Sequence, residues 1–407
     1  MNKIQEVNIQ DFDYDLPDHR IARYPLKKRS DSQLLHFSNG NISDKKFNEI
    51  IHLFESTDLW VVNNTKVIPA RLHFSKSTGA QIEIFCLEPM NMDYSQALAS
   101  IDRCSWKCFV GGAKKWKEGP LYHTVQVGSL NITLSARCIE KQDNAFIIEF
   151  EWSEVTFAEV LDAVGQLPIP PYLNRDTEPE DYDRYQTLFA ESSGSVAAPT
   201  ASLHFDNEVV QQILDKGVTQ QSLTLHVGAG TFKPVNTDQL GSHVMHAEYF
   251  EVGIELIEHW VKQIQNNQRI IVVGTTALRT LESVFWIAHE NLKPNEQGLF
   301  HVDQWLPYQG QAPKHKAQVM QDFLLTMKKH HWSKIVGTTQ IIMGPGYEVQ
   351  SADVLITNFH QPKSTLLLLV HAAVGENWKA LYQHALENDY RFLSYGDSSW
   401  LEIKKAP

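Results

Sequence analysis

Residues 269–290, RIIVVGTTALRTLESVFWIAHE, decide the fold class of this chain. The isoleucines and valines at its start are typical of a buried strand, because β-branched side chains favour an extended backbone. The residues that follow predict a helix, which begins at the two threonines after Gly274. Predicted strands and helices also alternate through residues 204–267 and again through 352–374. This alternation predicts an α/β fold built on a sheet.

Residues 70–152 follow a different pattern. Four stretches alternate between polar and apolar residues or are rich in β-branched residues, and turn residues separate them. They are AQIEIFCLEP (80–89), HTVQVGSL (123–130), NITLSARCIE (131–140) and AFIIEFEW (145–152). The pattern predicts a small all-β, barrel-like domain. A helix from Thr156 to Val164 follows it, with Thr156 and Glu159 at the spacing of a capping box.

The composition limits the possible partners. The 407 residues include 36 basic and 48 acidic side chains, and the net charge of −12 argues against nonspecific binding of nucleic acid over the whole surface. The amino-terminal residues lack the apolar core of a signal peptide, and the longest apolar run, TLLLLVHAAV (365–374), is too short to cross a bilayer. We therefore expect a cytoplasmic protein that makes no contact with a membrane. Any RNA would meet a local basic patch, for which the lysines around Trp116 are the candidates.

Polar residues gather where the predicted strands end. In an α/β sheet the loops at the carboxyl ends of the strands form the usual binding crevice, and free N–H groups at a helix start favour an anion. Three such loops are LHVGAGTFKPV (225–235), GTTALRTLE (274–282) and TNFHQPKSTL (357–366), and HVMHAEYF (243–250) follows the first. The candidate site residues in these stretches are His226, Gly228, Gly230, His246, Glu248, Thr275, Thr276, Arg279, Asn358, His360 and Lys363.

Familiar catalytic motifs are absent from the sequence. It has no GxSxG elbow and no Walker loop, and the pair Gly228 and Gly230 lacks the third glycine and the acidic residue of a dinucleotide fingerprint. His243, His246 and Glu248 are residue types that bind metals, but they lack a third histidine or an HExxH spacing, so we expect no metal site. Any single histidine among these could instead be a hydrogen-bonded residue of a packed loop.

Ordered motifs along almost the whole chain resemble the S-adenosylmethionine:tRNA ribosyltransferase-isomerase family of queuosine biosynthesis. The motifs are YDLPDHRIARYP (14–25), NNTKVIPARL (63–72), LPIPPYLNR (167–175), DYDRYQTLFA (181–190), GSVAAPTASLHF (194–205), TLHVGAGTFKPV (224–235), HVMHAEYFEV (243–252), VGTTALRTLES (273–283), PGYEV (345–349), TNFHQPKSTLLLLV (357–370) and YRFLSYGD (390–397). The resemblance implies an α/β domain of residues 1–69 and 153–407 with the β-barrel domain, 70–152, inserted into it. It also implies that GSVAAPTASLHF is a wall of the active site, small because substrate lies against it.

The resemblance implies an unusual reaction. S-adenosylmethionine serves as a ribosyl donor to 7-aminomethyl-7-deazaguanine in tRNA, the ribose rearranges to give epoxyqueuosine, and adenine and methionine leave. No tightly bound cofactor is needed, because the sulfonium acidifies the adjacent 5′ carbon and makes methionine a good leaving group. The protein must supply a base, an acid and orientation. We expect the enzyme to be a monomer.

Roles for single residues follow from this chemistry as hypotheses. A base needs a pKa near neutrality, so His246 and Glu248 are nominated, with His226 and His360 as alternates. The methionine carboxylate suits a cation near a helix N-terminus, and the adenine suits an aromatic ring. Arg279 or Lys363 would hold the carboxylate, and Phe205 or Phe359 would stack on adenine. Asp397 would meet the donor's amino group or a ribose hydroxyl. The full set of substrate-binding candidates is Phe205, Gly228, Gly230, Thr275, Thr276, Arg279, Asn358, Phe359, Lys363 and Asp397. For tRNA phosphates the candidates are Lys114, Lys115 and Lys117.

Several positions depart from the family pattern. Gln33 stands where an arginine is expected, Ser202 where a glycine is expected and Gln361 where a leucine is expected. These changes suggest altered substrate or weak activity. Two alternatives therefore stay open. One is a metal-independent enzyme that acts on S-adenosylmethionine or another nucleoside without tRNA, and the other is a binding protein that has lost turnover.

Overall fold

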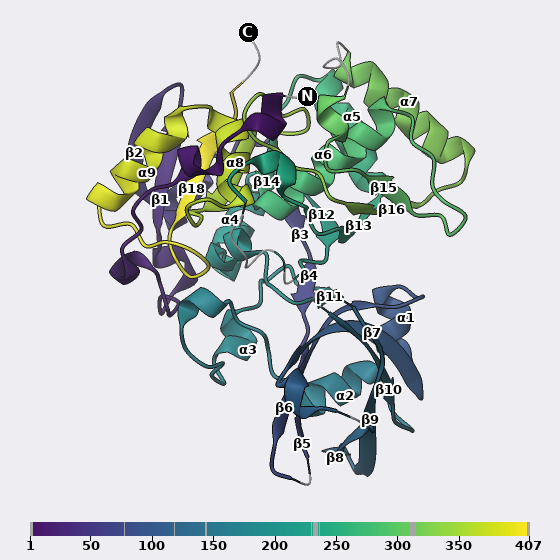
Figure 1. Ribbon diagram of the computed structural model, residues 1–407. Helices are drawn as coiled ribbons and strands as arrows, with labels where there is room; N and C mark the ends of the chain where they lie inside the picture. The colour runs from purple at the N-terminus through teal and green to yellow at the C-terminus, as the bar shows by residue number, and fades with distance from the viewer. Residues whose placement is uncertain are drawn as a thin grey trace.

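A ten-stranded mixed sheet forms the larger part of the molecule (Figure 1). The computed structural model describes residues 3–76, 78–117, 119–142, 145–228, 230, 235, 237–309 and 315–404. Across the sheet the strands are β15 (Phe300–Val302), β16 (Lys334–Thr339), β13 (Glu248–Gly253), β12 (Thr219–Leu225), β3 (Leu59–Asn63), β14 (Ile270–Val273), β17 (Val354–Asn358), β18 (Ser398–Glu402), β1 (Gln33–Ser38) and β2 (Asn41–Lys46). The predicted α/β fold is confirmed.

Four neighbouring strands at the centre of this sheet are parallel, in the order β12, β3, β14 and β17. Their apolar residues are fully buried because helices pack on the sheet, which is typical of parallel strands. The helices of this part are α3 (Asp181–Arg184), α4 (Asn207–Asp215), α5 (Ile254–Gln265), α6 (Thr275–His289), α7 (Lys316–Lys329), α8 (Thr365–Val374) and α9 (Asn377–Glu387). The predicted strand at 269–273 and helix after it are confirmed as β14 and α6.

An antiparallel sheet of six strands forms the smaller, lower part in Figure 1. Its strands, in spatial order, are β5 (Arg71–Ser75), β6 (Gln81–Pro89), β7 (Arg103–Gly111), β10 (Phe146–Glu151), β9 (Leu130–Lys141) and β8 (Leu121–Val127). The edge strands β5 and β8 curl toward each other, and the rings of Phe74 and His123 meet across the gap at 6.2 Å. The sheet is therefore barrel-like, as predicted.

Helices α1 (Tyr94–Ala99) and α2 (Phe157–Val164) pack against this barrel. The predicted capping box at α2 is confirmed, since Thr156 and Glu159 each bond the other's backbone N–H. The barrel core includes Ile68 and Leu161, outside the predicted domain limits of 70 and 152. Those limits stay a prediction. A short parallel pair, β4 (Thr65–Val67) with β11 (Ser192–Ser195), lies between the two sheets.

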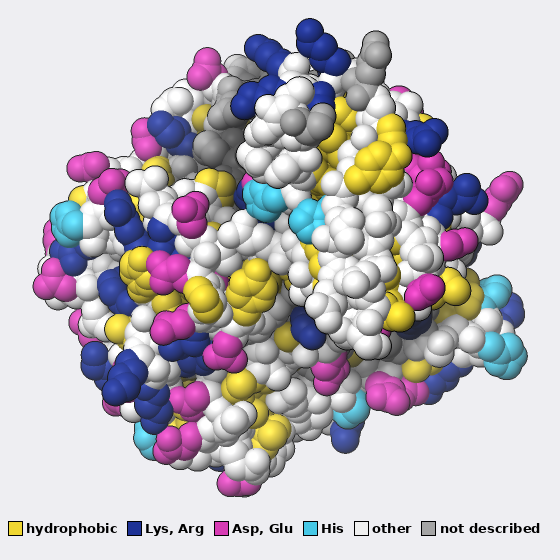
Figure 2. Space-filling view, turned by 90° about the horizontal axis from the view of Figure 1, so that it is seen from below, with side chains coloured by type: hydrophobic (Ala, Val, Ile, Leu, Met, Phe, Trp, Pro, Cys, Tyr) yellow, Lys and Arg dark blue, Asp and Glu magenta, His cyan; other side chains and the backbone are white. Residues whose placement is uncertain are grey.

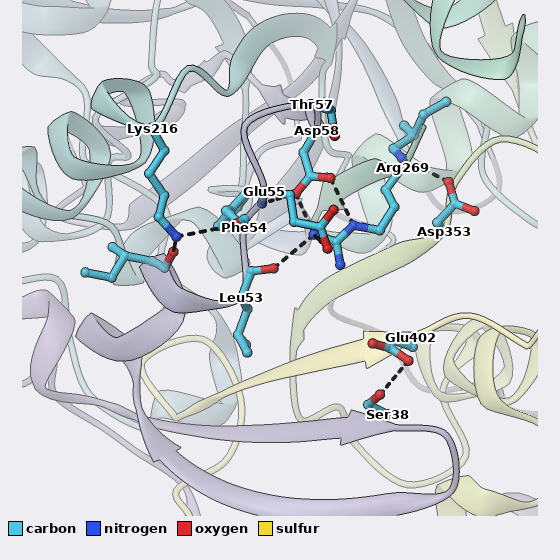
Figure 3. A network of polar contacts seen from close by, with 12 residues as sticks. Ser38, Leu53, Phe54, Glu55, Thr57, Asp58, Lys216, Arg269, Asp353 and Glu402 are labelled. Atoms are coloured by element: carbon cyan, nitrogen blue, oxygen red, sulfur yellow. Dashed lines mark hydrogen bonds and ion pairs between the residues drawn. The ribbon is translucent and has the colours of Figure 1, made fainter. Parts of the chain in front are cut away.

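An ion-pair network fixes the amino ends of the central strands (Figure 3). The carboxylate of Asp58, which precedes β3, accepts two hydrogen bonds of 2.9 and 2.7 Å from the guanidinium of Arg269, which precedes β14. Asp353, which precedes β17, accepts a hydrogen bond of 2.9 Å from the backbone N–H of Ile270. This network holds the amino ends of β3, β14 and β17 together, so a binding site can form in the loops at their carboxyl ends.

Candidate active site

A cleft opens at the carboxyl ends of three of these strands. It contains about 720 Å³ of space and is lined by Val227 after β12, by residues 274–276 after β14, and by residues 357–361 at the end of β17. We call it the donor cleft. Of the predicted site residues it brings together Thr275, Thr276, Asn358, Phe359 and His360.

A wall of small residues, 197–201, closes one side of the donor cleft. The Ser195 hydroxyl fixes this wall to the loop after β12, because it accepts from Val227 N at 3.0 Å and donates to Ala197 O at 2.6 Å. Since alanine side chains end at Cβ, a flat ring can lie close to the backbone here. Residues 197–201 of GSVAAPTASLHF thus line this cleft, and the role of the stretch as an active-site wall stays a prediction.

Helix α6 points its N-terminus at the cleft. Its N-cap is Gly274, whose φ of 91° suits glycine, and the first helical residues, Thr275 and Thr276, line the space. The amide of Asn63, at the end of β3, lies 3.3 Å from Thr276 Oγ1 and donates to Leu225 O at 3.0 Å. The unpaired N–H groups of the first turn can therefore bind a polar or anionic group.

Asn358 presents a buried acceptor along the same cleft. Its Nδ2 atom lies 3.0 Å from His204 Nε2 and donates to Leu393 O at 3.2 Å. Its Oδ1 atom is buried and has no hydrogen-bond partner within the described part of the chain. A buried acceptor without a donor is costly, so this oxygen is suited to an N–H group of a ligand.

His360 is held on several sides. Its Nε2 lies 2.9 Å from Thr357 Oγ1, its backbone N–H donates to Tyr382, and its carbonyl accepts from the hydroxyl of Tyr14. Burial lowers the pKa of His360 to about 3. The ring is therefore neutral near pH 7 and serves as a hydrogen-bonding group of the cleft.

Glu248 and Arg279 form a buried ion pair behind the cleft. Arg279 Nη1 donates to the Glu248 carboxylate, and Gly228 N donates to the same carboxylate at 3.3 Å. The Nε and Nη2 atoms of Arg279 have no hydrogen-bond partner among the residues described. Arg279 thus compensates the charge of Glu248, and the Nε and Nη2 edge of its guanidinium can still donate hydrogen bonds to a ligand.

His226 lies in an aromatic stack between the two sheets. Its ring is parallel to that of Tyr249 at 5.8 Å and 4.4 Å from that of Tyr94, and its Nδ1 is 2.8 Å from Thr65 Oγ1. Burial lowers its pKa to about 4. A Cβ at Gly194 would lie only 2.8 Å from the His226 ring, which explains the glycine there.

His246 is exposed and lies against Gly230, where a Cβ would come within 2.0 Å of its ring. The loop residues next to Gly230, 229 and 231–234, lie outside the described residues. Gly228, Gly230 and His246 therefore share one side of the site with the Glu248–Arg279 pair.

Three predicted substrate contacts, Phe205, Lys363 and Asp397, do not line the cleft, and a fourth, Phe359, lines it with a buried ring. The ring of Phe205 is fully buried against Phe47, Trp60 and Phe189, so the prediction that it stacks on adenine is wrong. Phe359 lines the cleft, and its ring packs among Tyr382, Tyr390 and Phe392 and is 2% exposed, so its stacking on adenine stays a prediction.

Lys363 pairs with Asp13 at 3.0 Å and does not line the cleft, so its predicted contact with the donor carboxylate is not supported. Asp397 is buried and accepts hydrogen bonds from Gln33 N at 2.9 Å and Arg391 N at 2.7 Å. It also pairs with the guanidinium of Arg391. These contacts give Asp397 a structural role and leave its predicted contact with the donor unsupported.

The predicted RNA contacts lie on the barrel. Lys114, Lys115 and Lys117 are exposed, and none of them forms an ion pair with a residue that the structure describes. Lys76 reaches the carbonyl of Lys115 at 3.0 Å, which places this patch beside the hairpin of β5 and β6 at the far end of the barrel in Figure 1.

The departures from the family pattern fall in different places. Gln361 lines the donor cleft, whereas Ser202 is fully buried and lines neither described cavity next to it. Gln33 starts β1, and its side chain donates to Asp389 O at 3.3 Å. Of these three positions, only Gln361 lines the donor cleft.

Two residues of the cleft, Tyr172 and Ser394, and His204, which follows the wall and contacts Asn358, were not among the residues predicted from the sequence. His204 ends the small-residue stretch and could have been nominated from it, because a histidine beside small residues at a ligand wall is a usual polar contact. Tyr172 and Ser394, hydrogen-bonded to each other at 2.6 Å, come from distant loops that only the fold brings together. Within the described residues, no group of three or more metal-binding side chains gathers, and no helix could span a membrane.

Comparisons with known proteins agree on one family. The family model described as "Queuosine biosynthesis protein" matches residues 9–401. The chain is 40% identical over 400 residues to the S-adenosylmethionine:tRNA ribosyltransferase-isomerase of Acinetobacter baumannii (strain AYE), covering 97% of this chain and 99% of that protein.

The enzyme of the same name from Dichelobacter nodosus is 37% identical, covering 96% of this chain and 95% of that protein. The crystal structure of S-adenosylmethionine tRNA ribosyltransferase from Thermotoga maritima aligns with a TM-score of 0.46 and 26% identity, over 96% of this chain and 99% of that one. The family match and the near full-length identities show that this chain belongs to the queuosine biosynthesis protein family.

Proposed function

We propose that this chain transfers and isomerises the ribosyl group of S-adenosylmethionine onto 7-aminomethyl-7-deazaguanine in tRNA, giving epoxyqueuosine and releasing adenine and methionine. The observation that carries the proposal is the 40% identity, over nearly the full length of both chains, to enzymes named for this activity. The donor cleft at the carboxyl edge of the sheet supports it, because this edge is where α/β folds bind their substrates.

The adenosine part of the donor would lie in the donor cleft. The small wall at residues 197–201 leaves room for a flat base, and Asn358 Oδ1 offers an acceptor for its amino group. The N-terminus of α6, with Thr275 and Thr276, would meet polar groups of the ribose. S-adenosylmethionine would thus be a substrate held by backbone and neutral side chains.

Arg279 is the best candidate for the methionine carboxylate. Arg279 is buried and pairs with Glu248 through Nη1. Its Nε and Nη2 atoms have no hydrogen-bond partner among the described residues. A guanidinium edge of this kind binds a carboxylate with two parallel hydrogen bonds. Lys363 is already engaged by Asp13.

His246 is the best candidate for the base that removes a proton next to the sulfonium. His226 and His360 have pKa values lowered to about 4 and about 3, so both are weak bases near pH 7. Glu248 is already engaged by the guanidinium of Arg279 and by Gly228 N. His246 alone among the four nominees is exposed.

The test is the release of adenine from S-adenosylmethionine in the presence of tRNA that carries 7-aminomethyl-7-deazaguanine, followed by chromatography. We expect release that depends on the modified tRNA and is matched by a mass gain of that RNA. The same tRNA without the modified base is the control. Release without RNA would instead identify a small-molecule enzyme, and tight binding of the donor without release would identify a binding protein.

A further inference from the structure

A second cavity, which we call the arginine pocket, adjoins the donor cleft. It contains about 280 Å³ of space, and Arg29, Arg184 and Arg391 line it together with Ser32 and His204. Ser394 lines both cavities. The two are also joined through the hydrogen bond between His204, which lines the arginine pocket, and Asn358, which lines the cleft. A group bound in the arginine pocket would therefore be a direct neighbour of one bound in the cleft.

Backbone carbonyls, rather than carboxylates, hold two of the guanidinium groups. Arg29 donates to the carbonyls of Leu203 and Asp183 at 3.2 and 3.0 Å. Arg184 donates to the carbonyls of residues 26 and 27, at 2.6 and 3.5 Å. Neither forms an ion pair with any residue of the described part of the chain. These contacts orient both side chains but leave their charges uncompensated.

The positive charge of the pocket acts on its neighbours. Burial lowers the pKa of Arg29, and the charge of Arg184 lowers it further, more strongly than Asp183 or Asp206 raises it. The pKa of His204 is lowered to about 3, by burial and then by Arg391 and Arg29. Among the residues that the structure describes, only Arg391 of the three arginines has a carboxylate partner, Asp397 at 3.1 Å. The pocket is therefore prepared for an anion.

We propose that the arginine pocket binds a backbone phosphate of the RNA substrate, next to the nucleotide whose base enters the donor cleft. The proposal rests on the proposed function. A planar guanidinium group can donate two parallel hydrogen bonds to two oxygens of one phosphate. The hydroxyls of Ser32 and Ser394 add further donors. The lysine patch of the barrel lies at the far end of the barrel and cannot serve this nucleotide.

A phosphate fits the surroundings better than the carboxylate of the donor. Lys27, next to the pocket, is exposed, and Figure 2 shows Lys and Arg side chains gathered on the side of the molecule that carries β1, β2 and α3. Basic side chains outside the pocket can contact further phosphates of a polyanion, whereas a single carboxylate needs only one enclosed cation. Both ligands have the same chemistry at the guanidinium, so the experiment must separate them.

The experiment measures binding of full-length tRNA by the intact protein over a range of salt concentrations, without turnover. For Arg29→Gln and Arg184→Gln we expect roughly tenfold weaker binding at low salt and a slope of log Kd against log salt that falls by about 0.7 to 0.9, the effect of one lost phosphate contact. S-adenosylmethionine binding, measured by calorimetry, should not change. Lys262→Gln, which removes an exposed charge on α5, should leave the slope unchanged.

Thermal unfolding of each variant shows whether it is folded. Arg184→Lys keeps the positive charge, so it should restore most of the slope of log Kd against log salt. Weaker binding of S-adenosylmethionine with an unchanged salt slope would overturn the proposal and assign the pocket to the donor carboxylate. No change in either measurement would overturn it as well. Adenine release by the unmodified protein is measured separately, so failure of the proposed function is distinguishable from failure of the pocket.

Discussion

His204 Nε2 and Asn358 Nδ2 lie 3.0 Å apart, and this contact fixes the protonation of one residue and the orientation of the other. An amide nitrogen can only donate, so Nε2 of His204 accepts and its Nδ1 carries the proton, which it donates to Ser32 Oγ at 2.9 Å. The amide of Asn358 is thereby locked with Oδ1 as a free acceptor in the cleft. His204, three residues after the wall, thus orients the amide of Asn358 at the end of β17.

Asn358→Asp should weaken binding of S-adenosylmethionine. The carboxylate would turn an acceptor toward His204 Nε2 and remove the fixed orientation of Oδ1, a loss of about 1.4 kcal/mol that corresponds to about tenfold in Kd. Calorimetry on the folded variant measures it. The matched control is Asn388→Asp, since Asn388 makes the same type of contact, 3.3 Å to His384, on the surface. Equal affinity of the Asn358 variant and the unchanged protein would contradict the assignment.

Acid should destabilise the protein through its buried histidines. Burial lowers the pKa values of His204 and His360 to about 3 and of His226 to about 4, below the value of about 6.5 in the unfolded chain. The unfolded chain binds more protons in that range, so this stability is fully present above pH 6.5 and is lost as the pH falls toward 3 to 4.

The expected loss at pH 5 is at most about 2 kcal/mol for each histidine. Urea unfolding at pH 7.5, 6 and 5 measures it. In His204→Gln the fall in the free energy of unfolding with pH should be shallower than in the unchanged protein. An identical pH dependence would show that His204 is not held neutral in the folded state.

The sequence predicts the classes of structure better than it predicts the site. The β-branched run at 270–273 and the alternation in 70–152 specify strands locally, so the α/β fold and the barrel-like sheet follow from short-range patterns. The cleft is harder, because its wall at 197–201 and its strand ends at 227, 274–276 and 357–361 come from segments separated by 26 to 81 residues of chain. Phe205 shows the limit: an aromatic ring next to a ligand wall looks available in the sequence, but its burial depends on Trp60 and Phe189, which the fold brings to it.

Asp58→Asn should lower the free energy of unfolding by about 3 kcal/mol. The side chain of Asp58 is fully buried and compensates Arg269, and removing one charge of such a pair leaves the other uncompensated. The network lies at the amino ends of β3, β14 and β17, whereas the donor cleft lies at the carboxyl ends of β14 and β17, so the KM for S-adenosylmethionine should stay the same. Urea unfolding tests the first point and adenine release the second.

Glu55→Gln is the control, because Glu55 is 67% exposed and 3.5 Å from Arg269. Its cost should be below about 0.5 kcal/mol. Similar costs for the two variants would contradict the view that burial makes the Asp58 pair important.

Two departures from the family pattern should behave oppositely. The Ser202 hydroxyl is buried and has no hydrogen-bond partner in the described part of the chain. Ser202→Ala should therefore stabilise the protein by about 1 kcal/mol and leave donor binding unchanged. Gln361→Leu should change the Kd for S-adenosylmethionine several-fold, because Gln361 lines the donor cleft, and should leave the thermal midpoint nearly constant. Unfolding and calorimetry on both variants separate the two effects, and an altered donor Kd in Ser202→Ala would contradict the placement of Ser202 outside the cleft.

His246→Gln should lower kcat for adenine release at least about 100-fold and leave the Kd for S-adenosylmethionine within about twofold, because a general base contributes to the reaction and not to ground-state binding. Glutamine keeps the polar shape against Gly230 but cannot take up a proton. His259→Gln is the matched control, since His259 is a partly exposed histidine on α5 whose ring contacts only the Glu255 carbonyl among the hydrogen bonds of the described residues. The acidic limb of the pH profile of kcat should disappear in His246→Gln and persist in the control. A variant that keeps both its rate and its acidic limb would rule out His246 as the base, and the same two measurements on Glu248→Gln would then decide whether the carboxylate beside Arg279 takes the proton instead.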